Sequence, residues 1–162
     1  MTVTVISLGA GVQSTTMALM AAHGEITPMP DCAIFADTGW EPAAVYEHLH
    51  WLMSPNVLPF PVFKVSAGNI REDVVASARG GSRTANPPFF TKGDGEREGF
   101  LRRSCTKEYK IEPITAKIRD MIGLKPRQRA PKTPVVEQWM GISTDEAMRV
   151  KPSREAWIAL RW

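Results

Sequence analysis

Short apolar runs alternate with helix-forming segments along this chain, and the alternation restricts the fold more than any other feature. Residues 3–8, 32–36 and 60–65 are short, largely apolar runs that turn residues follow, as is typical of buried strands. Apolar residues recur at helical spacing over 14–23 and 42–52. Strands that alternate with helices favour a parallel sheet, so the sequence predicts an α/β fold with helices on both faces of the sheet. Pro61 predicts that the third run is an edge strand or that the proline stands at its start.

Segments rich in glycine and proline separate the remaining elements. Residues 80–99 show no apolar period and are predicted to be a long loop. Residues 125–134 contain three prolines and are predicted to be a mobile connection. The other expected elements are a helix capped by Asn69, a helix over 110–122 with Pro113 near its start, a strand over 135–142 and a short helix capped by Thr144.

The chain has 162 residues, which at about 100–200 residues per domain predicts a single domain over 1–162. Its 43% hydrophobic and 23% charged residues exclude collagen, coiled coil and general disorder. It lacks an apolar run long enough to span a membrane and the basic, apolar start of a signal peptide. Its two cysteines could form at most one disulfide, so we expect a cytoplasmic protein. The apolar pattern is interrupted over 154–162, from which we expect a further C-terminal segment.

Positive charge is concentrated in one part of the sequence. Residues 102–132 contain ten Lys or Arg and three acids, a net charge of +7, which leaves −4 for the rest of a chain whose total is +3. Such a stretch indicates an anion site, for the phosphates of a nucleotide or of a nucleic acid. The alternative is a solvated face followed by a mobile loop.

The turn Gly9-Ala10-Gly11 follows the first predicted strand and precedes a helix capped by Ser14 or Thr15. Backbone N–H groups in a glycine-rich turn can point at an anion, and the helix N-terminus adds a favourable dipole. The two hydroxyls could also donate to phosphate oxygens. There is no lysine as in a Walker P-loop and no third glycine as in a dinucleotide fingerprint. The alternative is an ordinary strand-to-helix turn.

This turn resembles the pyrophosphate-binding loop of the PP-loop superfamily of adenine nucleotide α-hydrolases. The superfamily form is S-G-G-x-D-S, and in the alignment on Ser14 its first Ser, first Gly and Asp are replaced here by Gly9, Ala10 and Gln13. Gln13 is similar to the phosphoadenosine phosphosulfate (PAPS) reductase branch. The resemblance implies a Rossmann-like (HUP-type) fold. It also implies nucleotide contacts from Ser7, Gly9, Gly11, Gln13, Ser14 and Thr15.

Three further segments resemble the same branch, and the four together run in the expected order from Ser7 to Arg149. The second, F-A-D-T-G-W-E-P, starts at Phe35 and is followed by Tyr46; the third starts at Arg103 and the fourth at Trp139. The resemblance implies catalytic roles for Arg103, Cys105 and Lys110. It implies nucleotide binding by Asp37, Thr38, Gly39, Gly141, Asp145, Glu146 and Arg149.

Each of these residues also has a physical interpretation. Asp37 stands where a strand ends and could accept from a ribose hydroxyl or hold Mg²⁺ through water; the alternative is an Asp that starts a turn. Arg103 and Lys110 could neutralise phosphate or sulfate, or be surface charges. Cys105 lies among basic residues that favour a thiolate, or is buried and inert. Cys32, inside a strand, is predicted to be core.

Asp145, Glu146 and Arg149 also allow a plainer interpretation, a helix start with acids near its positive end. The leading functional hypothesis is an enzyme that cleaves ATP between the α and β phosphates, with Mg²⁺, in sulfur transfer or nucleic acid modification. The first alternative is a PAPS reductase that needs a further cysteine segment, since none follows Arg149. The second is a nucleotide-binding subunit without turnover.

The partners expected besides the nucleotide follow from charge and from the resemblance. The basic stretch permits a nucleic acid partner through 102–132, whereas a protein partner or a second copy of the chain stays open. The resemblance also implies a phage or mobile-element context. No membrane partner is expected.

Overall fold

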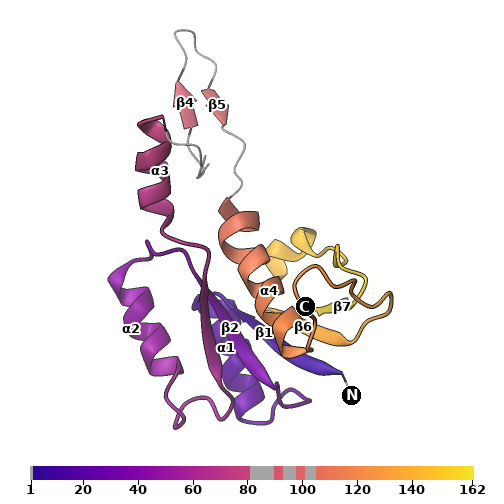
Figure 1. Cartoon of the computed structure of the whole chain (residues 1–162). Coiled ribbons are helices and arrows are strands. Elements are labelled where there is room, and N and C mark those ends of the chain that lie inside the picture. Colours follow the sequence, from indigo (N-terminus) through magenta and orange to yellow (C-terminus); the bar gives the residue numbers. More distant parts are fainter. Residues whose placement is uncertain (1, 81–89, 93–97, 101–104) are drawn as a thin grey trace.

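Five parallel strands form the central sheet, in the order β3-β2-β1-β6-β7 (Figure 1). The computed structural model describes residues 2–80, 90–92, 98–100 and 105–162. The predicted α/β fold with a parallel sheet is thus confirmed. The strands are β1 (Val3–Leu8), β2 (Cys32–Asp37), β3 (Val62–Ser66), β6 (Val136–Met140) and β7 (Ile158–Arg161).

The central strand β1 pairs with strands from opposite ends of the chain. Val5 aligns with Cys32 of β2, and Val3 aligns with Val136 of β6. The strand order therefore reverses between β1 and β6. In open α/β sheets ligands bind outside the carboxyl ends of the strands at such a switch point. The turn after β1 and the segment after β6 both begin there.

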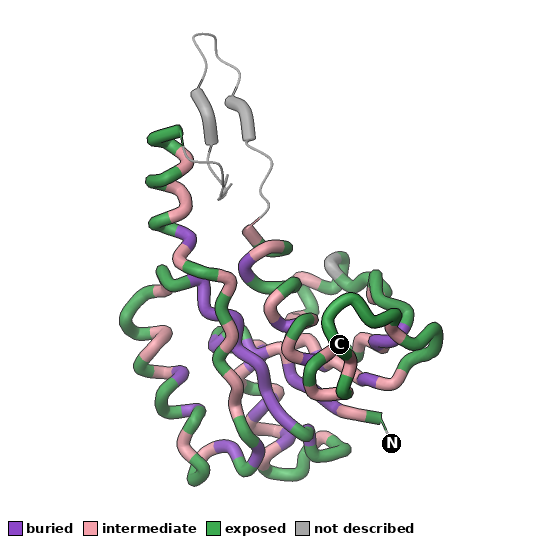
Figure 2. Tube along the Cα trace, in the orientation of Figure 1, coloured by how far each residue is buried: buried purple, intermediate pink, exposed green. Residues whose placement is uncertain are grey.

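Helices cover both faces of the sheet, as predicted. Helices α1 (Val12–Ala22) and α2 (Ala43–Leu52) pack on one face, and α4 (Glu112–Met121) packs on the other. All six residues of β2 are buried, since helices cover this strand on both sides (Figure 2). The first face buries Ile6, Leu8, Phe35, Leu49, Leu52 and Trp139, and the second Val5, Ile34, Ile114, Ile118, Val136 and Trp157.

The predictions for β3 and α3 are also confirmed. β3 is an edge strand of the sheet and begins directly after Pro61. Helix α3 (Ile70–Ala78) is capped by Asn69, whose Oδ1 accepts from the N–H groups of Arg71 and Glu72 at 3.0 and 3.2 Å. Figure 1 shows α3 rising beyond the edge of the sheet. Only Ile70 of this helix is buried.

Three predicted helix starts are wrong. Helix α1 begins at Val12 with Gly11 as its cap, because the Thr15 N–H already donates to the Gly11 carbonyl at 3.0 Å. The 3₁₀-helix η2 (Thr144–Arg149) is capped by Ser143 instead of Thr144. The helix predicted from residue 110 begins earlier, with the π-helix η1 (Thr106–Ile111) ahead of α4.

Three strands were not predicted. The loop expected over 80–99 contains β4 (Phe90–Lys92) and the start of β5 (Glu98–Phe100), which pair antiparallel. The segment ending at residue 162 contains β7, which pairs with β6 and forms an edge of the sheet. Strands of three or four residues are too short to show a period. Among the described residues no helix is long and apolar enough to cross a membrane.

Candidate functional site at the carboxyl ends of β1 and β6

The Ser14 side chain stabilises the turn between β1 and α1 through two hydrogen bonds to the backbone of the turn. Its Oγ accepts from the Gly9 N–H at 3.1 Å and donates to the Gly11 carbonyl at 3.3 Å. Ala10, between the two glycines, has a φ of 52°. Ser14 is buried, and its hydroxyl proton is engaged within the turn. The sequence predicted this hydroxyl as a phosphate donor, whereas the geometry favours a role in shaping the turn.

Gly141, directly after β6, packs against the first turn of α1. A Cβ at residue 141 would lie 2.6 Å from the Ser14 backbone nitrogen and 2.7 Å from the Gln13 carbonyl carbon. Gln13 Nε2 also donates to Ser143 Oγ at 3.4 Å. The first and fourth predicted segments, about 130 residues apart in sequence, therefore meet at this point.

Thr15 points away from this arrangement. Its Oγ1 lies 3.0 Å from His48 Nε2 on α2, and the His48 ring stacks on Trp51 with centroids 5.4 Å apart. The hydroxyl of Thr15 thus joins α1 to α2. Ser7, the other predicted hydroxyl, lies within β1 and aligns with Ile34 of β2 and Met140 of β6.

Asp37 lies at the carboxyl end of β2 and is 8% exposed. Its Oδ1 accepts from the Gly39 N–H and from the Tyr46 hydroxyl, both at 2.8 Å, and its Oδ2 lies 3.3 Å from Lys64 Nζ. Burial alone would raise the pKa of Asp37, but these hydrogen bonds and the lysine charge outweigh burial and lower the pKa. Burial and the Asp37 carboxylate in turn raise the pKa of Tyr46.

Magnesium does not fit Asp37 in this arrangement. Both carboxylate oxygens already have partners, and a cation would have to replace the Lys64 ammonium or the donors to Oδ1. In the part of the chain that the structure describes, no group of three or more His, Cys, Asp or Glu could hold a metal ion.

The turn after β2 packs on the start of α3. Gly39 has a φ of 73°, and a Cβ there would lie 3.0 Å from Asn69 Cα. Asn69 Nδ2 donates to the Gly39 carbonyl at 3.2 Å, and the Thr38 carbonyl accepts from Ile70 at 2.9 Å. Thr38 Oγ1 donates to Glu41 Oε1 at 2.9 Å. Thr38 and Gly39 therefore shape the edge of the site, and the turn needs glycine at residue 39.

Glu41 also connects this turn to the π-helix η1. Lys110 Nζ lies 3.6 Å from Glu41 Oε1, so the predicted catalytic lysine does reach the carboxyl edge of the sheet. Glu41, Tyr46 and Lys64 were not predicted as site residues. The first two follow Asp37 closely in the sequence, but Lys64 comes from β3 and is brought near by strand pairing.

Cys105 and Tyr109 belong to a small cluster between η1 and α3. Tyr109 is fully buried beside Ile70, and half-buried Cys105 packs against this pair. The Tyr109 hydroxyl donates to Asp73 Oδ2. Arg103 lies outside the described residues.

The fourth predicted segment contributes its glycine more directly than its charged residues. Asp145 is exposed, and hydrogen bonds from the Ser143 side chain and from its own backbone N–H lower its pKa. The Glu146 N–H donates to the Ser143 carbonyl at 3.0 Å. Arg149 ends η2, and its side chain lies outside the described part.

A groove of about 450 Å³ opens beside Gln13 and Gly141. Its wall is mainly apolar and includes Val12, Met17, Met20, Trp139 and Trp162. The candidate site therefore extends from the polar turn toward an apolar surface.

Comparison with protein-family models, with curated proteins and with solved structures finds no match to this chain. The fold and the site define its class on their own. It is a doubly wound α/β protein with a glycine-shaped turn at the switch point of its sheet.

Proposed function

We propose that this chain binds an adenine nucleotide at the carboxyl ends of β1 and β6. The observation that carries the proposal is the contact of Gly141 with the backbone of Gln13 and Ser14. It brings a second glycine segment against the N-terminus of α1 at the switch point, where ligands of open α/β sheets bind. The resemblance of four ordered segments to PP-loop proteins supports the same location.

The N-terminus of α1 would bind the phosphates. Its cap, Gly11, supplies no side-chain hydrogen bond, and its first turn contains no acidic residue. The first N–H groups of a helix have no carbonyl partner within the helix, and the helix dipole favours an anion there. Backbone donors near Val12 and Gln13 therefore suit the β and γ phosphates of ATP.

Catalysis would then be attack on the α-phosphorus. A nucleophilic atom of the acceptor forms a bond to phosphorus, the bond to the α–β bridging oxygen breaks, and pyrophosphate leaves with that electron pair. Lys110 would exchange Glu41 for a phosphate oxygen, and Arg103 of the same segment would help to neutralise the developing charge. Mg²⁺ would accompany ATP as its counter-ion.

The cysteines of the chain favour this reaction over sulfonucleotide reduction. Burial, with a smaller contribution from Asp31, raises the pKa of Cys32 to about 12. Cys105 is half-buried against Ile70 and Tyr109. Both cysteine side chains are at least partly buried, whereas a cysteine that attacks a bound sulfonucleotide must reach its sulfur atom. The remaining hypothesis, a nucleotide-binding subunit without turnover, predicts tight nucleotide binding with release of neither pyrophosphate nor sulfite.

Titration calorimetry of ATP with Mg²⁺, beside adenosine 3′,5′-bisphosphate, tests the proposal. We expect tighter binding of ATP, and release of pyrophosphate once an acceptor is supplied. Gly11→Trp should abolish binding by filling the space before α1. Gly11→Ala is the matched control, because a Cβ at residue 11 meets nothing closer than Gln13 Oε1 at 4.0 Å. Preference for the bisphosphate, or equal binding by wild type and Gly11→Trp, would contradict the proposal.

A further inference from the structure

The basic stretch 102–132 divides into two parts with different surroundings. In the first part, three lysines have acidic partners: Lys107 with Glu112 at 3.5 Å, Lys110 with Glu41 at 3.6 Å, and Lys117 with Asp120 at 3.4 Å. The first part, 102–120, contains six Lys or Arg and three acids, a net charge of +3. The second part, 121–132, carries a net charge of +4 and has no acid within it.

The second part is the connection between α4 and β6. Residues 121–136 contain four basic residues and no acid. All four side chains are exposed, and none forms a salt bridge with an acid among the described residues. The four are Lys125, Arg127, Arg129 and Lys132.

A tight turn orders this connection around Arg127. The Gln128 N–H donates to the Lys125 carbonyl at 3.0 Å, and the Lys125 N–H donates to Gln128 Oε1 at 3.0 Å. Arg119 Nη2 on α4 donates a hydrogen bond to the Gln128 carbonyl at 2.5 Å. Arg127 has a φ of 63°, which glycine adopts far more readily. Arg127 is exposed, so burial of its side chain does not offset the cost of this conformation.

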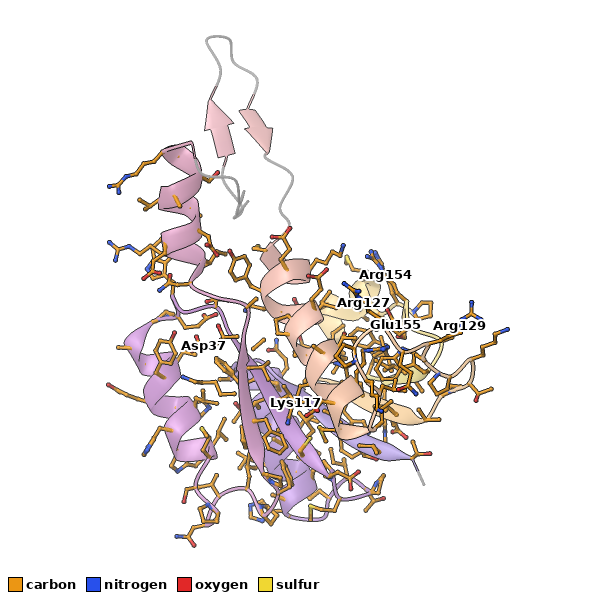
Figure 3. The ribbon with its side chains drawn as sticks, in the orientation of Figure 1. Asp37, Lys117, Arg127, Arg129, Arg154 and Glu155 are labelled. Carbon is orange, nitrogen blue, oxygen red and sulfur yellow. The ribbon has the colours of Figure 1, made fainter. Side chains whose placement is uncertain are left out.

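Arg154 adds a fifth charge from the segment before β7. Figure 3 shows Arg127, Arg129 and Arg154 on the same side of the molecule, and Asp37 well apart from them. Glu155 is the neighbouring acid, and its Oε2 accepts from Trp157 Nε1 at 2.8 Å. Arg154 is exposed and forms no salt bridge among the described residues.

We propose that Lys125, Arg127, Arg129, Lys132 and Arg154 form a surface that binds the phosphate backbone of double-stranded nucleic acid. Guanidinium groups match phosphate oxygens with two parallel hydrogen bonds. Residues 123–134 have no aromatic side chain, so the base stacking that favours single strands is not supplied by this connection. The one leucine among them, Leu124, is half-buried, which disfavours insertion into a membrane.

This surface is separate from the candidate nucleotide site. The connection leads into the start of β6, and Arg154 precedes the start of β7, whereas the glycine turn follows the end of β1. In a parallel sheet the starts of all strands lie at one side of the sheet and their ends lie at the opposite side. Duplex and nucleotide can therefore bind at the same time, and the inference does not depend on the proposed function.

Fluorescence anisotropy of a short labelled DNA duplex over a series of salt concentrations tests the inference. We expect log K to fall linearly with log salt, and Arg127→Gln/Arg129→Gln to weaken binding at least about 10-fold and to reduce the slope by about 2. The matched control is Arg71→Gln/Arg79→Gln, at the first turn of α3 and at its C-cap, which removes the same charge elsewhere and should change binding less than about 2-fold. Equal weakening by the two variants would overturn the proposal, as would stronger binding to a single strand or to phosphatidylserine vesicles.

Arg127→Gly separates the role of the side chain from that of the turn. Glycine accepts the backbone conformation at residue 127, so the melting temperature should stay unchanged or rise while duplex binding weakens. Unchanged duplex binding by Arg127→Gly would exclude Arg127 from the surface. ATP titration of the same variants shows whether the nucleotide site is intact, so that failure of one proposal is distinguished from failure of the other.

Discussion

The backbone nitrogen of Ser14 lies 2.6 Å from the point where a side chain at residue 141 would begin. Gly141 is therefore the residue through which β6 contacts the first turn of α1, and the contact leaves no room for a methyl group. It connects the end of one strand to the start of a helix from the other end of the sequence. The candidate site depends on this contact.

Gly141→Ala should lower the free energy of unfolding by about 1–3 kcal/mol, because the backbone of Gln13 or Ser14 must move to admit the Cβ. It should also weaken ATP binding, since the same backbone forms the turn. Urea denaturation and calorimetry measure the two effects. Gly9→Ala is the control, because its Cβ would meet Ser14 Oγ at 3.7 Å, an ordinary contact. Equal stability of the two variants would contradict the steric argument.

Ser14 and Thr15 are adjacent hydroxyl residues with different expected effects. Ser14→Ala removes both hydrogen bonds inside the turn and should cost about 1–2 kcal/mol of stability, with ATP affinity reduced about 10-fold. Thr15→Val removes only the contact with His48 and should change ATP affinity less than about 2-fold. Calorimetry on both variants measures the difference. A larger loss of affinity in Thr15→Val would place that hydroxyl on the nucleotide instead.

Tyr46→Phe removes one of the donors to Asp37 and should lower stability by about 1.5–3 kcal/mol at pH 7. The folded-state pKa of Asp37 lies below its ordinary value of 3.8, so this stabilisation is present above that value and is lost as pH falls through the folded pKa. The difference between variant and wild type should therefore shrink in acid. Urea midpoints at neutral and acidic pH measure it.

The control for Tyr46 is the same substitution in an Asp37→Asn background. There the effect of Tyr46→Phe should be smaller and independent of pH, because no carboxylate is present to titrate. An equal, pH-independent cost in both backgrounds would mean that the tyrosine hydroxyl acts through its other hydrogen bond, accepted from the Glu41 N–H at 3.3 Å, and not through Asp37.

Cys32 should resist thiol reagents until the protein unfolds. Its side chain is fully buried and the pKa of its thiol is raised to about 12, so the folded protein presents almost no thiolate at pH 8. Cys105 is only half-buried and should react first. Cys105→Ser should then show no labelling in the native state and one thiol in urea. Rapid native labelling of this variant would contradict the burial of Cys32.

The parts of the fold with a strong local pattern could be predicted from the sequence. The run at 3–8 is largely apolar and rich in β-branched residues, the run at 32–36 is entirely apolar, and both are strands in the core. Asn69 was predicted as a cap because its side chain can bond to the next turn of its own chain, and it does. Such features depend on neighbours in sequence, so no tertiary information is needed.

The parts of the site that depend on tertiary contacts could not be predicted. Lys64 faces Asp37 because β3 pairs with β2, and Thr15 faces His48 because α1 lies beside α2. Neither partner is indicated by local sequence. The cap of α1 was misplaced for a related reason, since Ser14 uses its hydroxyl to close the turn before it and leaves Gly11 to begin the helix.

The pairing of β1 with β6 also sets the order in which the strands of the sheet can pair during synthesis on the ribosome. Val3 is among the first residues synthesised, whereas Val136, its partner in β6, is synthesised much later. The edge of β1 that faces β6 is therefore unpaired while β2 and β3 can already align on its other side. Such distant pairing is slow to form, since a long segment must be closed before the contact is gained. The N-terminal end of α1 thus acquires its glycine neighbour late, and a nascent chain arrested before residue 141 carries the turn without the backbone of Gly141 packed against it.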